Sequence, residues 1–248
     1  MTITVVAIQA VVAEQFGYQI SYQKTMKEKR KAMTRLIGDW YKSNVELSCF
    51  FLTLEQSNLG CIVYSKMVFG NSPNEESFQC VFWVFVPSIK GFTHYRLVLS
   101  IGGTYLYGKY KGTLLIAMGC DGNNQLFPLV FVIIEGENTN SWSWFFACIR
   151  VGVTQRKGLC LISNRHPIII VAVNETYSGW TKPDAYYRFC ICHLASYFST
   201  RFKYKTLKDL MCRTALESKV KKIISHMATI GWINVEARNW LGHIPLEK

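Results

Sequence analysis

Short apolar runs separated by turn signals fill residues 78–136, and this pattern commits that part of the chain to a β-sheet. The runs are "FQCVFWVF" at the start, "RLVLSI" at 96–101, "GTLLIAMGC" at 112–120 and "LFPLVFVIIEG" at 126–136. "DGNNQ" separates the last two and is a tight-turn signal, which predicts a hairpin. We therefore expect the last three runs to form a strand meander.

The pattern then changes to an alternation of helices and strands. Residues 137–153, "ENTNSWSWFFACIRVGV", have a helical period, and Asn140 or Ser141 is the expected N-cap. "GLCLIS" at 158–163 is an unbroken apolar run, which is typical of a strand buried on both faces. A second helix is expected to begin at Pro167, although the β-branched residues that follow would also suit a strand.

The rest of the chain completes an α/β fold. Residues 185–202 predict a fifth strand that passes into a helix, so we expect a mixed five-stranded sheet flanked by helices over residues 79–205. Residues 1–78 predict a helical N-terminal region that ends in a polar linker, because residues 70–78 carry Gly, Asn and Pro. Residues 206–248 predict a helical C-terminal region.

The charge balance indicates the class of partner. Lys and Arg outnumber Asp and Glu by 28 to 16, which gives a formal net charge of +12. Such an excess favours a polyanion, with nucleic acid as the first choice and an anionic membrane surface as the second. A basic protein with no such partner is the alternative that composition leaves open.

The cysteines and the apolar segments indicate the compartment. The nine cysteines lie mostly in apolar runs, as reduced core cysteines do, and an odd number does not suit a secreted disulfide framework. The longest apolar run, "PIIIVAV" at 167–173, is far shorter than the ~20 residues that a membrane-spanning helix needs. We expect a soluble intracellular protein with no membrane partner.

The pair Gly102-Gly103, at the end of the predicted strand 96–101, has three interpretations. The glycines could cradle a phosphate, relax a turn, or mark a position where a functional side chain has been lost. The sequence contains neither a G-x-G-x-x-G nor a Walker pattern, and a strand rather than a helix follows. The phosphate-cradle interpretation is therefore rejected.

The order and spacing of several motifs resemble the plant Mutator-like element (MULE) transposases. The motifs are "GDWYKS", "VFWVF", "IKGFTHYR", "GTYLYGKYKGTLLIAMGCDGNNQLFPLVFVIIEGEN", "SWSWFF" and "LCLISNRH", followed by the Cys-x-x-His pair Cys190 and His193. The resemblance covers nearly the whole chain. It implies a ribonuclease-H-like fold that cleaves and joins DNA at transposon terminal repeats in the nucleus, with homo-oligomers as a further expectation.

The family's reaction depends on a triad of carboxylates. They hold two Mg²⁺ or Mn²⁺ ions, which activate the attacking oxygen and stabilise the leaving one. The resemblance places the first carboxylate in a Ser-Ile-Asp-Gly-Thr pattern, where this chain has Gly102. It places the second in Leu-Ile-Ser-Asp-Arg-His, where this chain has Asn164. Glu217 is our choice for the third acid, with Glu236 as the alternative.

The triad substitutions predict that the chain is catalytically inactive. Gly102 offers no side-chain ligand, and Asn164 lacks the charge that a hard cation prefers. Leu97, Tyr105 and Val130 stand where relatives tend to carry Pro, His and Ala, which is consistent with relaxed selection. One alternative is a non-catalytic, transposase-derived protein that binds DNA or regulates transcription. Another is a chain that folds poorly and has no function.

Basic and aromatic residues near the expected site suggest contacts with DNA. Lys109, Lys111 and Arg165 are the candidate phosphate ligands, because DNA affinity depends largely on such charges. Trp142 and Trp144 could stack on exposed bases, but core packing is the expected use.

Cys190 and His193, with Cys192 between them, resemble half of a zinc site. A zinc site needs four ligands, and only His166 is a candidate for joining the pair in space. We therefore expect core residues rather than zinc at this strand–helix junction. The spacing of the same residues gives no support to a Cys/His protease.

Overall fold

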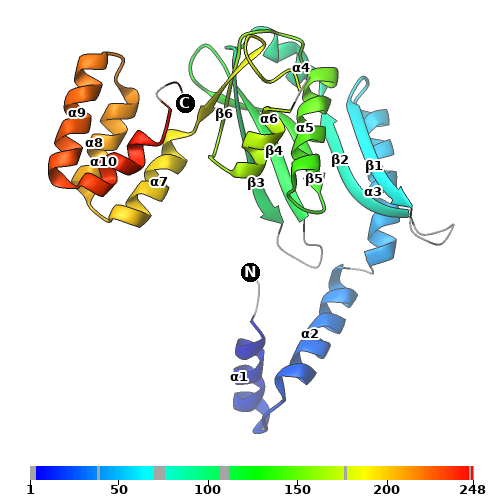
Figure 1. Ribbon diagram of the computed structural model, residues 1–248. Helices are drawn as coiled ribbons and strands as arrows, with labels where there is room; N and C mark the ends of the chain where they lie inside the picture. The colour runs from blue at the N-terminus through cyan, green and yellow to red at the C-terminus, as the bar shows by residue number, and fades with distance from the viewer. Residues whose placement is uncertain are drawn as a thin grey trace. The chain divides into compact units, whose positions relative to one another are not determined.

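The computed structural model describes residues 4–37, 40–69, 76–106, 112–175, 178–245 and 247. Its strands are β1 (Ile62–Phe69), β2 (Glu76–Val84), β3 (Val98–Leu106), β4 (Gly112–Cys120), β5 (Leu126–Ile134), β6 (Leu159–Ser163) and β7 (Ala185–Phe189). Its helices are α1 (Val5–Phe16), α2 (Tyr22–Ile37), α3 (Trp40–Ser57), α4 (Val86–Phe92), α5 (Thr139–Gly152), α6 (Pro167–Val173), α7 (Ile191–Phe202), α8 (Lys205–Leu216), α9 (Val220–Ile233) and α10 (Val235–Gly242). Figure 1 shows these elements along the chain.

The strands form one sheet of seven in the order β1-β2-β5-β4-β3-β6-β7. β1 pairs antiparallel with β2, whereas β3 and β7 both pair parallel with β6, so the sheet is mixed. Parallel neighbours need a crossover connection, and α6 lies in the connection between β6 and β7. The predicted α/β class and mixed sheet are confirmed.

The predicted number of five strands is wrong. β3 to β7 correspond to the five predicted strands, and β2 corresponds to the apolar run that begins at Phe78, which the predicted number does not include. β1 is a further strand, so the sheet has seven. β1 lies inside residues 1–78, where we expected only helices and a linker. Of the expected linker 70–78, residues 76–78 belong to β2 and residues 70–75 lie outside the described residues. Its register runs from Ile62 opposite Val84 to Phe69 opposite Glu76. A short segment such as β1 becomes a strand through hydrogen bonds to its neighbour, a contribution that local periodicity does not reveal.

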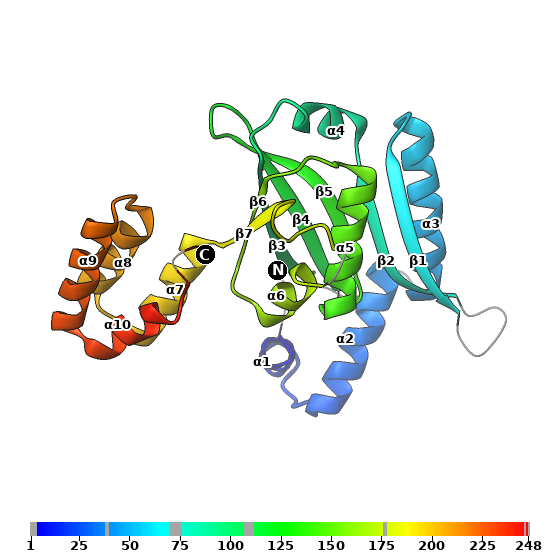
Figure 2. The same cartoon turned by 45° about the horizontal axis from the view of Figure 1, so that its top comes forward.

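The chain divides into two compact units by its internal contacts. One consists of Met1–Val86, Gly103–Leu114 and Val132–Gly136, and the other of Pro87–Gly102, Leu115–Phe131 and Glu137–Lys248. In the first unit α1 packs on α2, and α3 lies beside β1 (Figures 1 and 2). In the second, α5 packs on α6.

Helix α5 supplies much of the apolar core of the second unit. The helix buries Trp142, Phe145, Phe146 and Ile149, so the expectation that Trp142 packs in the core is confirmed. The predicted caps Asn140 and Ser141 are wrong by two or three positions, because Asn138 is the N-cap. Its Oδ1 accepts a hydrogen bond of 2.9 Å from the Ser141 backbone N–H.

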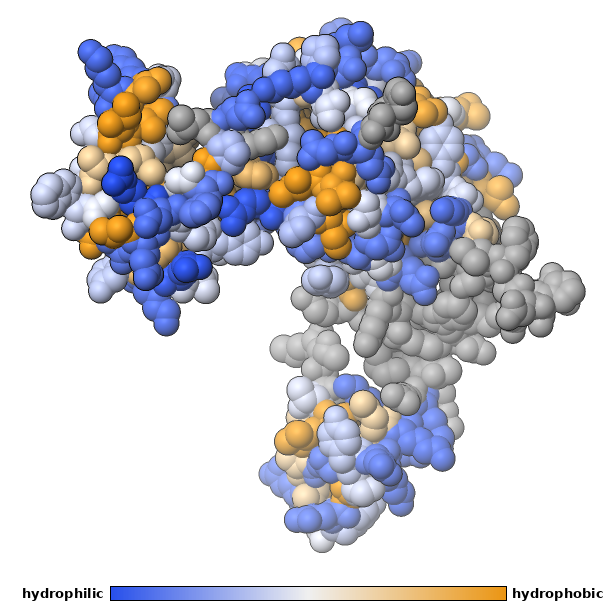
Figure 3. Space-filling view, viewed as in Figure 1, coloured by the Kyte–Doolittle hydropathy of each residue, from blue (hydrophilic) through white to orange (hydrophobic). Residues whose placement is uncertain are grey.

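Helices α7 to α10 form a bundle at the C-terminal end of the second unit (Figure 1). Their shared core contains Leu194, Ala195, Phe198, Phe202, Leu207, Met211, Ile230 and Ala237. The ring of Trp240 packs against this core, 5.6 Å from the ring of Phe198. Hydrophilic residues cover much of the bundle surface in Figure 3, with apolar groups between them. The prediction of a helical C-terminal region is thus consistent with these helices.

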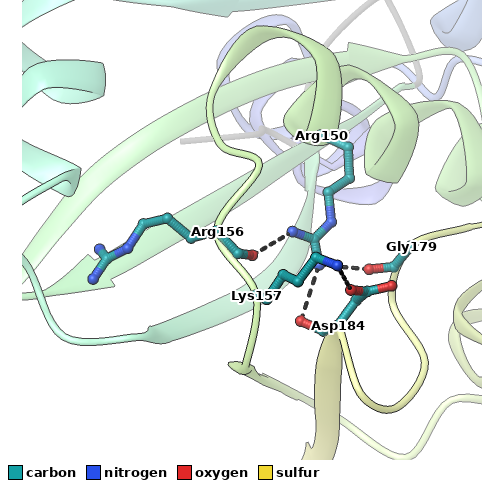
Figure 4. A network of polar contacts seen from close by, with 5 residues as sticks. All are labelled: Arg150, Arg156, Lys157, Gly179 and Asp184. Atoms are coloured by element: carbon teal, nitrogen blue, oxygen red, sulfur yellow. Dashed lines mark hydrogen bonds and ion pairs between the residues drawn. The ribbon is translucent and has the colours of Figure 1, made fainter.

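Arg150, in the last turn of α5, holds the loop before β7 in place (Figure 4). Its guanidinium donates hydrogen bonds to the backbone oxygens of Arg156 at 2.7 Å, Gly179 at 2.5 Å and Asp184 at 3.4 Å. The same group lies 4.3 Å from the ring centre of Trp180. Burial lowers the pKa of Arg150, and the charge of Asp184 opposes that shift.

Candidate functional site

Gly102 and Asn164, the two positions where the resemblance places carboxylates, lie on neighbouring strands. Gly102 is inside β3, which continues to Leu106 instead of ending near residue 101 as predicted, and Asn164 directly follows β6. Ser100 of β3 pairs with Ile162 of β6 in parallel register. Gly102 is two residues beyond Ser100, and Asn164 is two residues beyond Ile162. The two positions are therefore at the same level of the sheet. The carboxyl ends of parallel strands are a common place for ligand sites in α/β proteins. The parallel register therefore places positions 102 and 164 close together in the sheet.

Position 102 has room for a side chain. Gly102 is exposed, and a Cβ atom built there has no heavy atom within 4 Å. Neither a close approach of the backbone nor a positive φ requires glycine at this point. The backbone conformation therefore does not require glycine at position 102. This finding supports the interpretation that a side chain has been lost there, and it argues against the interpretation that the glycine relaxes a turn.

The side chain of Asn164 has an unused oxygen. Its Oδ1 is buried and finds no hydrogen-bond partner among the described residues. An unpaired buried acceptor costs free energy, so it marks a position that a ligand or a water would complete. A carboxylate at position 164, as the resemblance predicts, would place a charged oxygen where this chain has the neutral oxygen of Asn164.

A small hydroxyl network fixes the backbone at Asn164. The carbonyl oxygen of Asn164 lies 2.7 Å from Ser163 Oγ and 3.1 Å from the Tyr187 hydroxyl, both of which donate to it. The two hydroxyl oxygens are 2.7 Å apart. Burial raises the pKa of Tyr187, while its hydrogen bond with Ser163 acts in the opposite direction. Sequence reasoning missed Ser163 and Tyr187, since neither lies in a motif that predicts their contact.

Arg165 and His166, which follow Asn164, have structural partners. The Arg165 guanidinium lies 5.1 Å from the ring centre of Trp240, a cation–π distance. His166 is the N-cap of α6, and its Nδ1 accepts a 3.4 Å hydrogen bond from the Ile168 N–H. Arg165 is thus already in contact with the C-terminal bundle, and its role towards DNA stays a prediction. Lys109 and Lys111 lie outside the described residues.

Glu217 has a local role in the C-terminal bundle. The carboxylate lies between α8 and α9, where its Oε1 accepts hydrogen bonds of 3.0 Å from the backbone N–H groups of Ser218 and Lys219. Lys222 Nζ is 3.6 Å from its other oxygen. The hydrogen bond from Lys219 lowers the pKa of Glu217. The alternative acid, Glu236, lies in the first turn of α10.

Cys190 and His193 lie in the first turn of α7, with Cys190 as the N-cap. The Cys190 N–H donates a 2.7 Å hydrogen bond to the Ser163 carbonyl oxygen, which ties α7 to the end of β6. His193 and Cys192 are exposed and Cys190 is half-buried, so the expectation that these residues pack in the core is wrong. Both exposed residues lie on the side of the first turn of α7 that faces away from the buried Leu194 and Ala195. Within the described ranges, no group of three or more His, Cys, Asp or Glu side chains could hold a metal ion.

Comparison with known proteins identifies one family model. Residues 98–197 match the MULE transposase domain. The matched range includes Gly102, Asn164, Arg165, Cys190 and His193 but not Glu217. A comparison with curated proteins gives no match. Within the described part of the chain, no helix has the length and apolar character needed to cross a bilayer.

Proposed function

The chain carries a MULE transposase domain at residues 98–197, and we propose that it binds DNA but neither cleaves nor joins it. The mixed α/β sheet, with β3, β6 and β7 in parallel register, is compatible with the ribonuclease-H-like core of such a domain. The formal charge of +12 supports DNA as the partner. The nucleus is the compartment that this partner implies.

The paired positions Gly102 and Asn164 are the observation that carries this proposal. Phosphodiester chemistry with two metal ions needs several anionic oxygens on rigid strand ends. At this place the chain offers open space beside Gly102 and one neutral oxygen on Asn164. One neutral ligand does not retain a pair of divalent ions, so the family's Mg²⁺ or Mn²⁺ has no adequate site here.

The first test is a cleavage and strand-transfer assay on DNA selected for binding from a randomised pool, with Mg²⁺ and with Mn²⁺. We expect the unaltered chain to bind the selected DNA and to release no metal-dependent product. Robust metal-dependent cleavage by the unaltered chain would overturn the proposal.

The second test restores both carboxylates in the variant Gly102→Asp/Asn164→Asp. Gly102 has room for the new side chain, and Asn164→Asp hardly changes the volume. We expect Mg²⁺ to raise the thermal unfolding midpoint of this variant but not that of the unaltered chain, because a ligand stabilises the fold it binds. Gly122→Asp/Asn140→Asp adds the same charge at two positions on the exterior and is the control. Equal responses of the two double variants would argue against a metal site at 102 and 164.

The second candidate function is a transposase-derived regulator of transcription. It is favoured by the same combination of basic charge and missing carboxylates. A regulator should bind a defined DNA sequence with a salt-sensitive affinity that EDTA leaves unchanged. Equal affinity for all duplexes would contradict a role as a sequence-specific regulator. It would still agree with the first candidate, a protein that binds DNA without cleaving or joining it.

A further inference from the structure

The turn between α8 and α9 forms a surface pocket that the transposase core does not include. The pocket has a volume of about 480 Å³. Its walls come from the end of α8, the turn and the first two turns of α9, and they consist of Arg213, Leu216, Glu217, Lys222, Ser225 and His226. It lies beyond residue 197, where the match to the family model ends.

The charged groups of the pocket favour an anion. Arg213 and Lys222 contribute two cations, and both side chains belong to exposed residues. Glu217 is the acid in the wall, but its carboxylate accepts two backbone hydrogen bonds and faces Lys222 at 3.6 Å. Its negative charge is therefore largely offset by its own partners, and the wall keeps a net positive charge.

The pocket also contains hydrogen-bonding capacity that the protein does not use. The Nδ1 atom of His226 is buried and has no partner within the described residues. The hydroxyl of Ser225 lies one position earlier in the pocket wall. A guanidinium, an ammonium, an imidazole and a hydroxyl together match the several acceptor oxygens of a phosphate.

The surroundings of the pocket favour a phosphate on a long polyanion over a free phosphate ion. Residues 201–222 contain eight basic side chains and two acidic ones, the basic ones being Arg201, Lys203, Lys205, Lys208, Arg213, Lys219, Lys221 and Lys222, and the acidic ones Asp209 and Glu217. Lys219 and Lys221 are exposed next to the pocket. Such a run attracts successive phosphates of one backbone.

We infer that this pocket binds a backbone phosphate of DNA through Arg213, Lys222, Ser225 and His226. The inference rests on the proposed function only for the choice of DNA as the polyanion. On this inference, the C-terminal bundle contacts DNA through residues outside the range 98–197 that matches the transposase domain.

The test measures the affinity of the full chain for a fluorescent DNA duplex by anisotropy at several salt concentrations. Arg213→Ala/Lys222→Ala removes the pocket cations, and Lys24→Ala/Lys27→Ala removes the same charge from exposed positions of α2, outside both the pocket and the basic run 201–222. Because the pocket variant lacks two phosphate ligands, we expect it to bind about tenfold more weakly and its salt slope to fall by about 1.8. The control variant should bind no more than about threefold more weakly. Equal effects in the two variants would overturn the inference while leaving DNA binding, and so the proposed function, intact.

A second variant and a second readout guard against damage to the fold. Ser225→Asp places a negative charge in the pocket and leaves the hydrogen bonds of Glu217 within the turn unchanged, and it should weaken DNA binding at an unchanged melting temperature. In nuclear magnetic resonance spectra of the full chain, the DNA duplex should shift the ring signals of His226. A shift with inorganic phosphate but none with the duplex would reassign the pocket to a free anion and overturn the inference. Absence of any shift would overturn it as well.

Discussion

Asn164, the residue that follows β6, is held in place through its backbone carbonyl oxygen and not through its side-chain oxygen. Two hydroxyl groups, from Ser163 and Tyr187, donate to the Asn164 carbonyl oxygen. Tyr187 is 4% exposed, so water does not replace its hydrogen bonds when they are broken. The side-chain oxygen of Asn164 meanwhile stays unpaired among the residues that the structure describes. The residue at 164 can therefore change chemically while its backbone keeps the same place.

The hydroxyl of Tyr187 should thus contribute measurably to stability. We expect Tyr187→Phe to lower the free energy of unfolding by about 1–2 kcal/mol, because the variant leaves a buried carbonyl with one donor fewer. Tyr186→Phe is the matched control, since Tyr186 is the adjacent residue of the same strand and is 37% exposed. It should change the free energy by less than about 0.5 kcal/mol. Urea unfolding of the three proteins measures both effects, and equal decreases would disprove a special role for Tyr187.

At the scale of the element, helix α5 begins after Asn138, whose side chain caps the helix and which lies before the first apolar residue of the helical pattern. Asn138 has extended backbone angles, φ −146° and ψ 173°, and caps the helix through Ser141. Asn140, which sequence reasoning proposed as a cap, is already inside the first turn. Both residues belong to the same short polar segment, so composition alone does not distinguish them.

The assignment of the cap leads to a direct comparison of two variants. Asn138→Ala should lower the free energy of unfolding by about 1 kcal/mol, because a backbone N–H of the first turn loses its acceptor. Asn140→Ala, an exposed site two residues later, should have an effect near zero or slightly stabilising. Thermal unfolding followed by circular dichroism measures the difference. A larger loss of stability in Asn140→Ala than in Asn138→Ala would show that Asn140 is the N-cap, as the sequence pattern predicted.

At the scale of the whole molecule, burial raises the pKa values of several thiol and phenol groups. Burial raises the pKa of Cys80 to about 11 from 9.0, and Lys66 acts weakly in the opposite direction. Burial also raises the pKa values of Cys61, Cys160 and Tyr187. These groups lie in both compact units, so their effects act on the entire fold.

Alkaline pH should therefore destabilise the protein. Each of these pKa values is higher in the folded chain, so the unfolded chain loses its protons first as the pH rises. The stabilisation is complete below pH 9.0 and, for Cys80, is lost by about pH 11. That loss amounts to about 2–3 kcal/mol for a shift of two units.

Urea unfolding between pH 8 and pH 11 tests this dependence, since it covers the range over which Cys80 titrates. We expect Cys80→Ala to have a shallower fall in stability over that range, whatever its stability at neutral pH. Cys192→Ala, at an exposed thiol, should retain the slope of the unaltered chain. Identical slopes for all three proteins would show that the Cys80 thiol does not contribute.

The sequence alone determined the local elements and the chemistry missing from the site. Apolar periodicity identified β3 to β7 and the helices α5 and α7, because periodicity depends only on neighbours along the chain. The motif comparison identified Gly102 and Asn164 without any coordinates. It predicted an active-site position that lacks a charged ligand.

Only the tertiary structure decided which residues meet. The parallel register of β3 and β6 brings positions 102 and 164 to one level. The pairing of β6 with β7 brings the Tyr187 hydroxyl to the backbone oxygen of Asn164. The tertiary structure also showed β1 as a strand paired with β2. Such contacts join residues far apart in the chain, and their free energies depend on burial and hydrogen-bond geometry that no local pattern of residues records.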